Sequence, residues 1–359
     1  MEVAMTRLLV CCDGTWNTAR TAAPTNVVRL HRALATHGPD GVAQQGHYLE
    51  GVGTRPRERL VGGVFGLGLS ANVQDAYAFL VEHFEPGDEL FLVGFSRGAY
   101  TARSLAGLVR NVGVLRREHA DRQDEAYALY RDRAEHPRGQ VSTAFRARFS
   151  HESRIRAVGV WDTVGALGIP LGGLDTVRWL NRRWRFHDTA LSSRVDAAFH
   201  AVAVDERRRP FVPTLWQDDP AAAAEGRRVE QVWFTGAHSD VGGGYAERGL
   251  ADVALLWMAD RLTECGLGLD PDALSPPEVV PDPLGTVHDS RKGVHRMTRP
   301  VTRALGEVAP GSELAASSAV ERRRHDPAYG PNLGSYLARP DARVRPVRTR
   351  RDDAPGQPR

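Results

Sequence analysis

The stretch ELFLVGFSRGAYTARSLAGLV, residues 89 to 109, constrains the fold of this chain more than any other. An apolar run that predicts a buried strand breaks at Gly94-Phe95-Ser96-Arg97-Gly98, and a helical pattern starts at once. Glycines on both sides of a serine let strand and helix approach closely, because no side chain stands between them. The pattern predicts a sharp strand-turn-helix that raises the Ser96 hydroxyl above the edge of a sheet. The alternative is a glycine-rich turn whose serine only caps the helix.

Strand and helix patterns alternate along the chain around this turn. Strands are expected at 7–12, 47–53, 89–94, within 154–166 and at the start of 229–245, and helices at 25–38, 70–84, 98–109 and 250–266. This order predicts an α/β fold of the α/β-hydrolase-like kind: a mainly parallel sheet with helices on both faces and the serine turn, a nucleophile elbow, after a central strand.

One domain is expected over residues 6–338, followed by a basic, disordered tail over 339–359. A helical insertion is expected around 167–228. Its residues 167–188 mix leucine and tryptophan with arginine, which is typical either of a lid that meets anionic lipid or of a helical pair packed on the domain. Glycine-rich residues 61–69 are expected to form a loop, either a second mobile rim or a flexible crossover.

Composition excludes several classes of protein. Hydrophobic residues make up 42% of the 359 residues, enough for a large core, and the net charge of +3 gathers near the C-terminus, so no nucleic-acid site is expected. Three cysteines form neither a disulfide framework nor a metal-binding spacing. We find no apolar span of bilayer length and no signal peptide. The chain is expected to be made in the cytoplasm, with any export by a secretion system proceeding without a signal peptide.

A serine nucleophile needs a histidine to take its proton and an acid to orient that histidine, in the chain order Ser, acid, His. Two aspartates stand at strand ends after the turn, Asp162 in VGVWDTVG and Asp240 in TGAHSDVGGGY. The acid usually follows the second strand after the nucleophile, and 229–234 is the last strong strand pattern. This count favours Asp240, with Asp162 as the alternative.

The histidine is expected to be His288, because it follows Asp240 and precedes the proline-rich end, although no clear strand comes before it. His238 is the alternative, two residues before Asp240 and able to line the same loop. Lesser candidates are His187, His200 and His295.

Acyl transfer also requires donors for the developing oxyanion. One is expected from the N–H of Arg97, directly after the serine. The second is expected from Gly14 or Thr15, in the loop after strand 7–12. The competing interpretation of that loop is that Asp13 and Asn17 only cap a turn.

The segments DGTWN, GFSRGAYTAR, VWDTVG and WFTGAHSDVGGGY together resemble the α/β-hydrolase-like family that includes the catalytic domains of type VI secretion phospholipase effectors. The resemblance covers about residues 6 to 300. It implies a Ser/His/Asp hydrolase that cleaves carboxylic esters of lipids with phospholipase A-type specificity and without a cofactor or metal. It places the nucleophile on Ser96 and the acid on Asp240. The implied partners are an ester or phospholipid substrate and a transiently contacted membrane surface.

Other functions stay open at this stage. One is a non-catalytic interaction protein that keeps the scaffold, and another is an esterase for small non-lipid molecules. A dehalogenase-type phosphatase fails because Cys11 occupies the place of its first aspartate. A metal hydrolase built on Asp13, His238 and Asp240 lacks a supporting ligand spacing.

Overall fold

The computed structural model describes residues 5–15, 17–51, 64–132, 134–165 and 191–349. The strands in these residues are β1 Thr6–Cys12, β2 Ala43–Leu49, β3 Glu89–Phe95, β4 Val114–Leu115, β5 Ser150–His151, β6 Ile155–Trp161, β7 Val195–Ala203, β8 Arg228–Phe234, β9 Glu313–Ala316 and β10 Val344–Arg345. The α-helices are α1 Asn26–Arg32, α2 Val64–His83, α3 Arg97–Val112, α4 Gln123–Arg131, α5 Gln140–Phe149, α7 Pro220–Ala224, α8 His238–Gly242, α9 Gly249–Glu264, α10 Ser317–His325 and α11 Pro331–Leu337. The 3-10 helices are η1 Arg117–Arg122, η2 Arg209–Phe211 and η3 Gly293–Met297.

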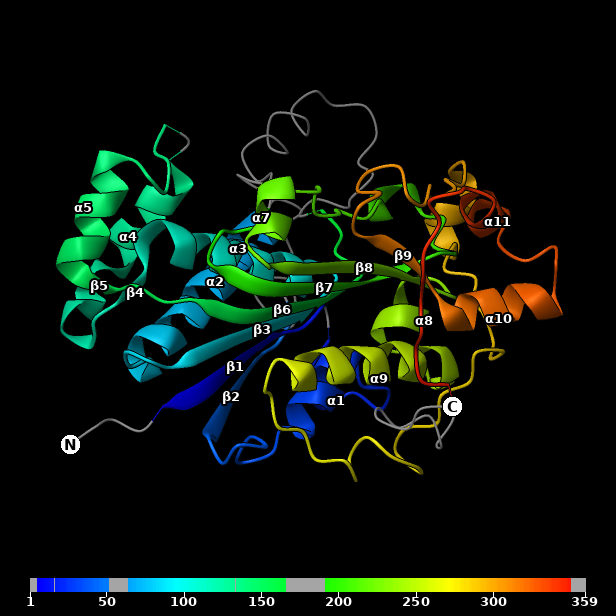
Figure 1. Ribbon diagram of the computed structural model, residues 1–359, viewed down its shortest axis with the longest axis horizontal. Helices are drawn as coiled ribbons and strands as arrows, with labels where there is room; N and C mark the ends of the chain where they lie inside the picture. The colour runs from blue at the N-terminus through cyan, green and yellow to red at the C-terminus, as the bar shows by residue number, and fades with distance from the viewer. Residues whose placement is uncertain (1–4, 16, 52–63, 133, 166–190, 350–359) are drawn as a thin grey trace.

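Eight of the described strands form one sheet in the order β10-β9-β8-β7-β6-β3-β1-β2 (Figure 1). Every pairing in this sheet is parallel. Strand β3 lies between β1 and β6, so the turn that follows it is central. The carboxyl ends of parallel strands share one edge of the sheet, and this edge is where α/β folds hold their ligands.

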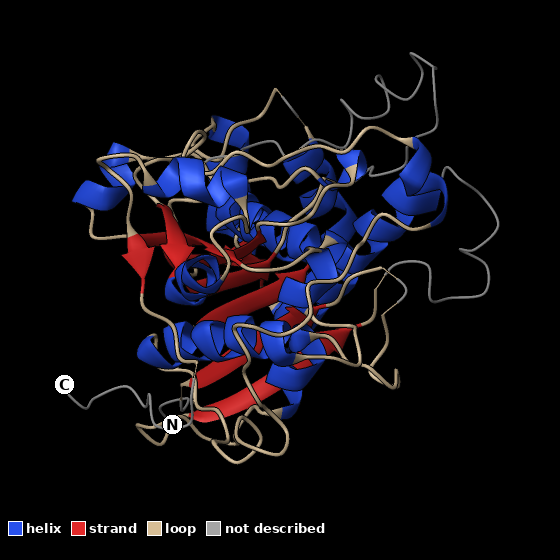
Figure 2. Ribbon diagram, turned by 90° about the vertical axis from the view of Figure 1, so that its right-hand side faces the viewer, coloured by secondary structure: helices blue, strands red, loops and turns tan. Residues whose placement is uncertain are grey.

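Helices cover both faces of the sheet, as the side chains of β1 illustrate. Leu9 and Cys11 pack into a core that includes α1 and α9, while Leu8, Val10 and Cys12 pack into a second core with α2 and α3. This alternation follows from the period of two in a strand. Figure 2 shows the sheet crossing the molecule with helices on either side. The predicted α/β-hydrolase-like fold is confirmed.

The structure corrects the expected insertion around 167–228. Residues 195–203 form β7, a buried strand between β6 and β8 in the main sheet. Asp196 and His200 interrupt its apolar pattern, and the remaining residues include four alanines, so sequence periodicity gave a weak strand signal. The expected lid, residues 167–188, lies outside the described residues.

The ends of several elements also differ from expectation. Helix α2 begins at Val64, so most of the glycine-rich stretch 61–69 is helical and not a loop. Strand β2 ends at Leu49, earlier than the expected 47–53. The proline-rich end supplies β9, α10, α11 and β10. The expected disordered tail is wrong for its first part, because Val344 of β10 pairs with Ala315 of β9.

Among the described helices, we find none with the length and apolarity that crossing a bilayer requires.

Candidate active site

Ser96 occupies a strained turn between β3 and α3. Its φ is 59°, a value that costs a non-glycine residue roughly 1–3 kcal/mol. The two flanking glycines are required by space: a Cβ on Gly94 would lie 2.4 Å from the carbonyl oxygen of Gly98, and a Cβ on Gly98 would lie 2.1 Å from that of Cys12. The predicted tight turn is therefore formed, and it leaves the Ser96 side chain without a capping bond to the helix.

Two side chains from other strand ends complete a hydrogen-bonded chain with Ser96. The Nε2 of His238 lies 2.8 Å from Ser96 Oγ, and its Nδ1 lies 2.5 Å from Asp162 Oδ2. Asp162 follows β6, and His238 is the first residue of α8, after β8. All three residues are buried. An imidazole that contacts a hydroxyl through one nitrogen and a carboxylate through the other is oriented to take the hydroxyl proton.

Asp162 is fully buried and held as a carboxylate by four hydrogen bonds from three residues. Its Oδ1 accepts hydrogen bonds from the N–H of Ala203 at 3.0 Å and from Arg303 at 2.6 Å, and its Oδ2 accepts a second bond from Arg303 at 3.0 Å besides the His238 contact. Burial by itself raises the pKa of this carboxyl. The charge of Arg303 and the contact with His238 outweigh burial, so the net pKa lies well below its usual range.

The imidazole of His238 is enclosed by aromatic rings. Phe95 packs against it with 4.6 Å between ring centroids, and Phe211 meets it edge-on at 4.9 Å. Burial lowers the pKa of His238, and the nearby carboxylates of Asp162 and Glu206 only partly offset this. The ring is therefore neutral near pH 7, which is the state in which it acts as a base.

Asp13 shapes the loop that faces Ser96 from the end of β1. Its carboxylate accepts hydrogen bonds from Gly14 N–H at 2.6 Å, Thr25 Oγ1 at 2.8 Å and the Tyr48 hydroxyl at 2.7 Å. A Cβ on Gly14 would lie 3.3 Å from Ser96 Cβ, so the loop lies directly against the serine. Because the Gly14 N–H is already bonded to Asp13, Gly14 does not fit the donor role expected for it, and Thr15 is the remaining candidate.

The structure separates the expected pair Asp240 and His288 from Ser96. His288 Nδ1 lies 2.6 Å from Asp240 Oδ1, as a triad would require, but His288 Nε2 contacts Glu247 Oε2 at 2.7 Å. The position beside Ser96 Oγ belongs to His238. The preferred assignment of Asp240 and His288 is thus not supported by the geometry, and the alternatives Asp162 and His238 occupy those places.

One reason why the sequence favoured Asp240 is that its periodicity does not indicate the strand β7. With β7 present, β8 is the third strand of the main sheet after the elbow and not the second, so the count that favoured Asp240 was wrong; the acid that contacts His238, Asp162, follows the first of these strands, β6. Sequence reasoning also missed Arg303, which lies outside any periodic element and carries no motif.

The lesser histidine candidates lie elsewhere. His200 is buried in β7, where its Nε2 accepts a hydrogen bond from Thr163 N–H at 3.0 Å, and His295 lies in η3. His187 is outside the described residues.

The described residues include no group of three or more His, Cys, Asp or Glu side chains placed to hold a metal ion. Of the three ligands considered for a metal hydrolase, His238 contacts Ser96, Asp240 pairs with His288, and Asp13 holds its own loop.

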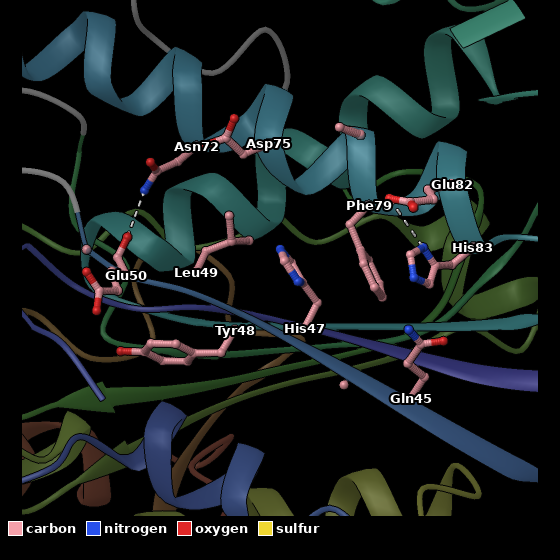
Figure 3. Close-up of a pocket in the computed structure, with 13 residues that line it drawn as sticks. Gln45, His47, Tyr48, Leu49, Glu50, Asn72, Asp75, Phe79, Glu82 and His83 are labelled. Carbon is pink, nitrogen blue, oxygen red and sulfur yellow. Dashed lines mark hydrogen bonds and ion pairs between the residues drawn. The ribbon is translucent and has the colours of Figure 1, made fainter. Parts of the chain in front are cut away.

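A separate cavity of about 710 Å³ lies between the edge strand β2 and α2 (Figure 3). His47 points toward α2 and stacks on Phe79 with 4.4 Å between ring centroids, while Tyr48 points to the opposite side of the strand, where it reaches Asp13. Glu50 and Glu82 also line the cavity. Neither Ser96 nor His238 lines this cavity.

The parallel sheet and the strained serine turn after its central strand define an α/β-hydrolase-like protein. Residues 6–261 match the family model described as T6SS, phospholipase effector Tle1-like, catalytic domain. The chain belongs to this family. Arg303 and His288 lie beyond the matched residues.

Individual relatives resemble the chain more distantly. An uncharacterized protein of Saccharomyces cerevisiae, YEL023C, is 30% identical over 228 residues, which are 57% of this chain and 32% of that protein. The crystal structure of an uncharacterized protein from Pseudomonas aeruginosa has a TM-score of 0.44 and 21% identity, covering 76% of this chain and 48% of that one. The Tle1 effector bound to the VgrG spike from the type 6 secretion system has a TM-score of 0.37 and 19% identity, covering 68% and 52%. The chain spans about a third of the yeast relative and about half of the two solved chains.

Proposed function

We propose that the chain is a serine hydrolase that cleaves carboxylic esters of phospholipids through a triad of Ser96, His238 and Asp162. The observation that carries the proposal is the bridging position of His238, 2.8 Å from Ser96 Oγ and 2.5 Å from Asp162 Oδ2. Membership of a phospholipase effector family supports a lipid ester as the substrate.

In the first half of the proposed reaction, Ser96 Oγ attacks the ester carbonyl carbon and His238 Nε2 takes the hydroxyl proton. Asp162 stabilises the imidazolium that forms. The carbonyl oxygen gains a negative charge, which is stabilised by N–H groups from Arg97 and Thr15 and by the positive end of α3. When the tetrahedral intermediate collapses, the C–O bond to the alcohol breaks and His238 returns its proton to the leaving lysophospholipid oxygen.

The second half releases the acyl group from Ser96. A water molecule attacks the acyl carbon while His238 Nε2 takes one of its protons. The new tetrahedral intermediate collapses, the bond to Ser96 Oγ breaks, and His238 delivers the proton to that oxygen. The products are a fatty acid and free enzyme. Two steps with moderate barriers replace one difficult step.

The choice of a lipid over a small ester rests on family membership, and it is testable with the purified protein. We expect release of fatty acid and lysophospholipid from phosphatidylethanolamine or phosphatidylglycerol vesicles, and much slower turnover of a soluble short-chain ester. Faster cleavage of the soluble ester would move the assignment to a small-molecule esterase. We further propose that the protein acts at a membrane surface, reached by secretion-system export as the family description suggests.

Ser96→Ala provides the control for chemistry. It removes the nucleophilic oxygen but keeps the turn, so we expect an unchanged thermal unfolding midpoint and a loss of roughly 10³-fold or more in kcat. Ester cleavage at the wild-type rate by the folded variant would contradict the proposal, whereas folded wild type without any ester cleavage would favour a scaffold protein without turnover.

A further inference from the structure

We propose that Arg303 is a positioning residue of the active site that fixes Asp162 and lowers the basicity of His238. The inference rests on the proposed triad. Arg303 is outside residues 6–261, which match the family model, so a segment of this chain beyond that match completes the site.

The guanidinium of Arg303 donates hydrogen bonds to both carboxylate oxygens of Asp162. One guanidinium nitrogen lies 2.6 Å from Oδ1 and the other 3.0 Å from Oδ2, and the side chains are 3% and 0% exposed. A two-pronged contact of this kind fixes the carboxylate in its plane as well as its position. Since His238 Nδ1 contacts the same Oδ2, the plane of the carboxylate sets the direction in which the imidazole is held.

Further bonds hold Arg303 itself. Its guanidinium also donates to the backbone carbonyl of Ala203, at 2.7 Å, and to that of Phe211. Its own carbonyl accepts a hydrogen bond from Asn332 in α11 at 3.0 Å. The arginine is thereby tied to the end of β7, to η2, which carries the ring of Phe211 against His238, and to α11. A residue held from three sides loses little further freedom when the reaction takes place.

The charge of Arg303 has a definite effect on His238. In a triad without this contact the full negative charge of the acid favours the imidazolium. Here a buried cation beside Asp162 counteracts that charge. The other groups around His238 are Glu206, whose carboxylate pairs with Arg208 at 2.9 Å, and the uncharged Ser96. His200 of β7 is near enough to Asp162 and to Arg103 of α3 for their charges to act on it, but burial and the charge of Arg103 lower its pKa to about 3, so it is neutral.

Removal of the Arg303 charge should therefore make His238 more basic. We expect Arg303→Gln to move the acid limb of the activity profile to higher pH by about one unit, because an opposite charge no longer weakens the field of Asp162. A residue needed only for packing would lower the amount of folded protein or the maximal rate without moving this limb.

The test is the rate at which a fluorophosphonate probe modifies Ser96 between pH 4.5 and 9. In this reaction Ser96 Oγ bonds to phosphorus, fluoride leaves, and His238 takes the proton, so the rate follows the fraction of neutral His238 without any lipid. Peptide mass spectrometry locates the adduct. Arg299→Met is the matched control, because it removes a positive charge from the same segment at an exposed position. The acid limb of its labelling-rate profile should coincide with that of wild type.

Arg303→Lys keeps the charge but loses the two-pronged contact. We expect the acid limb of its labelling-rate profile to stay within about 0.3 pH unit of wild type, while its maximal labelling rate falls at least about threefold. This variant also supplies the test if Arg303→Gln does not fold. An upward shift in the glutamine variant together with an unmoved limb in the lysine variant supports the inference. The inference would be overturned if the acid limbs of wild type and Arg303→Gln coincided. It would also be overturned if Arg303→Lys had the same maximal labelling rate as wild type. No Ser96 adduct in wild type would instead refute the proposed function.

Discussion

His288 Nδ1 lies 2.6 Å from Asp240 Oδ1, and the Asp240 carboxylate also accepts hydrogen bonds from the N–H groups of Ala237 and His288. These bonds tie the segment around His288 to the first turn of α8, whose first residue is His238. Tyr245 stacks on the His288 ring with 4.0 Å between centroids. The pair resembles the base and acid of a triad but faces Glu247, so we interpret it as the anchor of the turn that presents His238.

The roles of the two aspartates can be separated by parallel substitutions to asparagine. Asp162→Asn should lower kcat by about 10³- to 10⁴-fold, because an amide favours the wrong His238 tautomer. Asp240→Asn should lower kcat by less than about tenfold and mainly lower the unfolding midpoint. Steady-state kinetics with thermal unfolding curves for both variants make the comparison, and the reverse ranking of kcat would return the acid role to Asp240.

The pH dependence of turnover follows from the burial of His238. Its pKa is lowered from 6.5, so the neutral base persists below that pH. We therefore expect the acid limb of the kcat/KM profile, which reports the free enzyme, to have its midpoint below pH 6.5. An acid limb centred clearly above pH 7 would show that His238 is not the group that titrates.

Stability should respond to pH through His288. Burial alone would lower its pKa, but the hydrogen bonds from its ring to Asp240 and Glu247 raise it above 6.5. The folded state then binds a proton more tightly than the unfolded state. The resulting stabilisation is complete below the unfolded pKa of about 6.5 and is lost as pH rises through the folded value.

We expect the unfolding midpoint of wild type to fall across this alkaline window more steeply than that of His288→Asn. Glu247→Gln should have a smaller effect, because Glu247 is 71% exposed and water screens its charge. Identical pH dependence in wild type and His288→Asn would rule out this linkage.

The Asp13 loop offers a test of oxyanion binding. Tyr48→Phe removes one of the hydrogen bonds to the Asp13 carboxylate, 2.7 Å long, without changing the loop sequence. We expect kcat to fall several-fold with little change in KM, and stability to fall by about 1–3 kcal/mol. Tyr127→Phe is the matched control, since it removes a hydroxyl bonded to Ser70. Equal effects of the two variants on kcat would contradict a role for the Asp13 loop.

The turn at Ser96 could be predicted because local sequence determines it. Gly94 and Gly98 are required by the close approach of backbone atoms, and apolar strand and helix patterns lie directly beside them. The same holds for the parallel sheet around β1, β3, β6 and β8, because each of these strands ends in a buried apolar run, such as 8–12 in β1 and 232–234 in β8.

The partners of Ser96 could not be ranked correctly because long-range order decides them. The alanine-rich β7 gives little apolar periodicity, yet its presence changes the number of strands between Ser96 and Asp240. His238 stands only two residues before Asp240, which is an awkward spacing for a hydrogen bond between its ring and that acid. In the structure its ring reaches back to Asp162, 76 positions earlier in the chain. The contact with Arg303 joins residues 141 positions apart and has no local signature.

The most direct test of the account is fluorophosphonate labelling at pH 7.5 of wild type, His238→Ala and His288→Ala, with adducts located by peptide mass spectrometry. The account predicts an adduct on Ser96 in wild type, a loss of at least about 100-fold in labelling rate for His238→Ala, and a rate within about tenfold of wild type for His288→Ala. Normal labelling of His238→Ala together with loss in His288→Ala would contradict the Ser96, His238 and Asp162 triad.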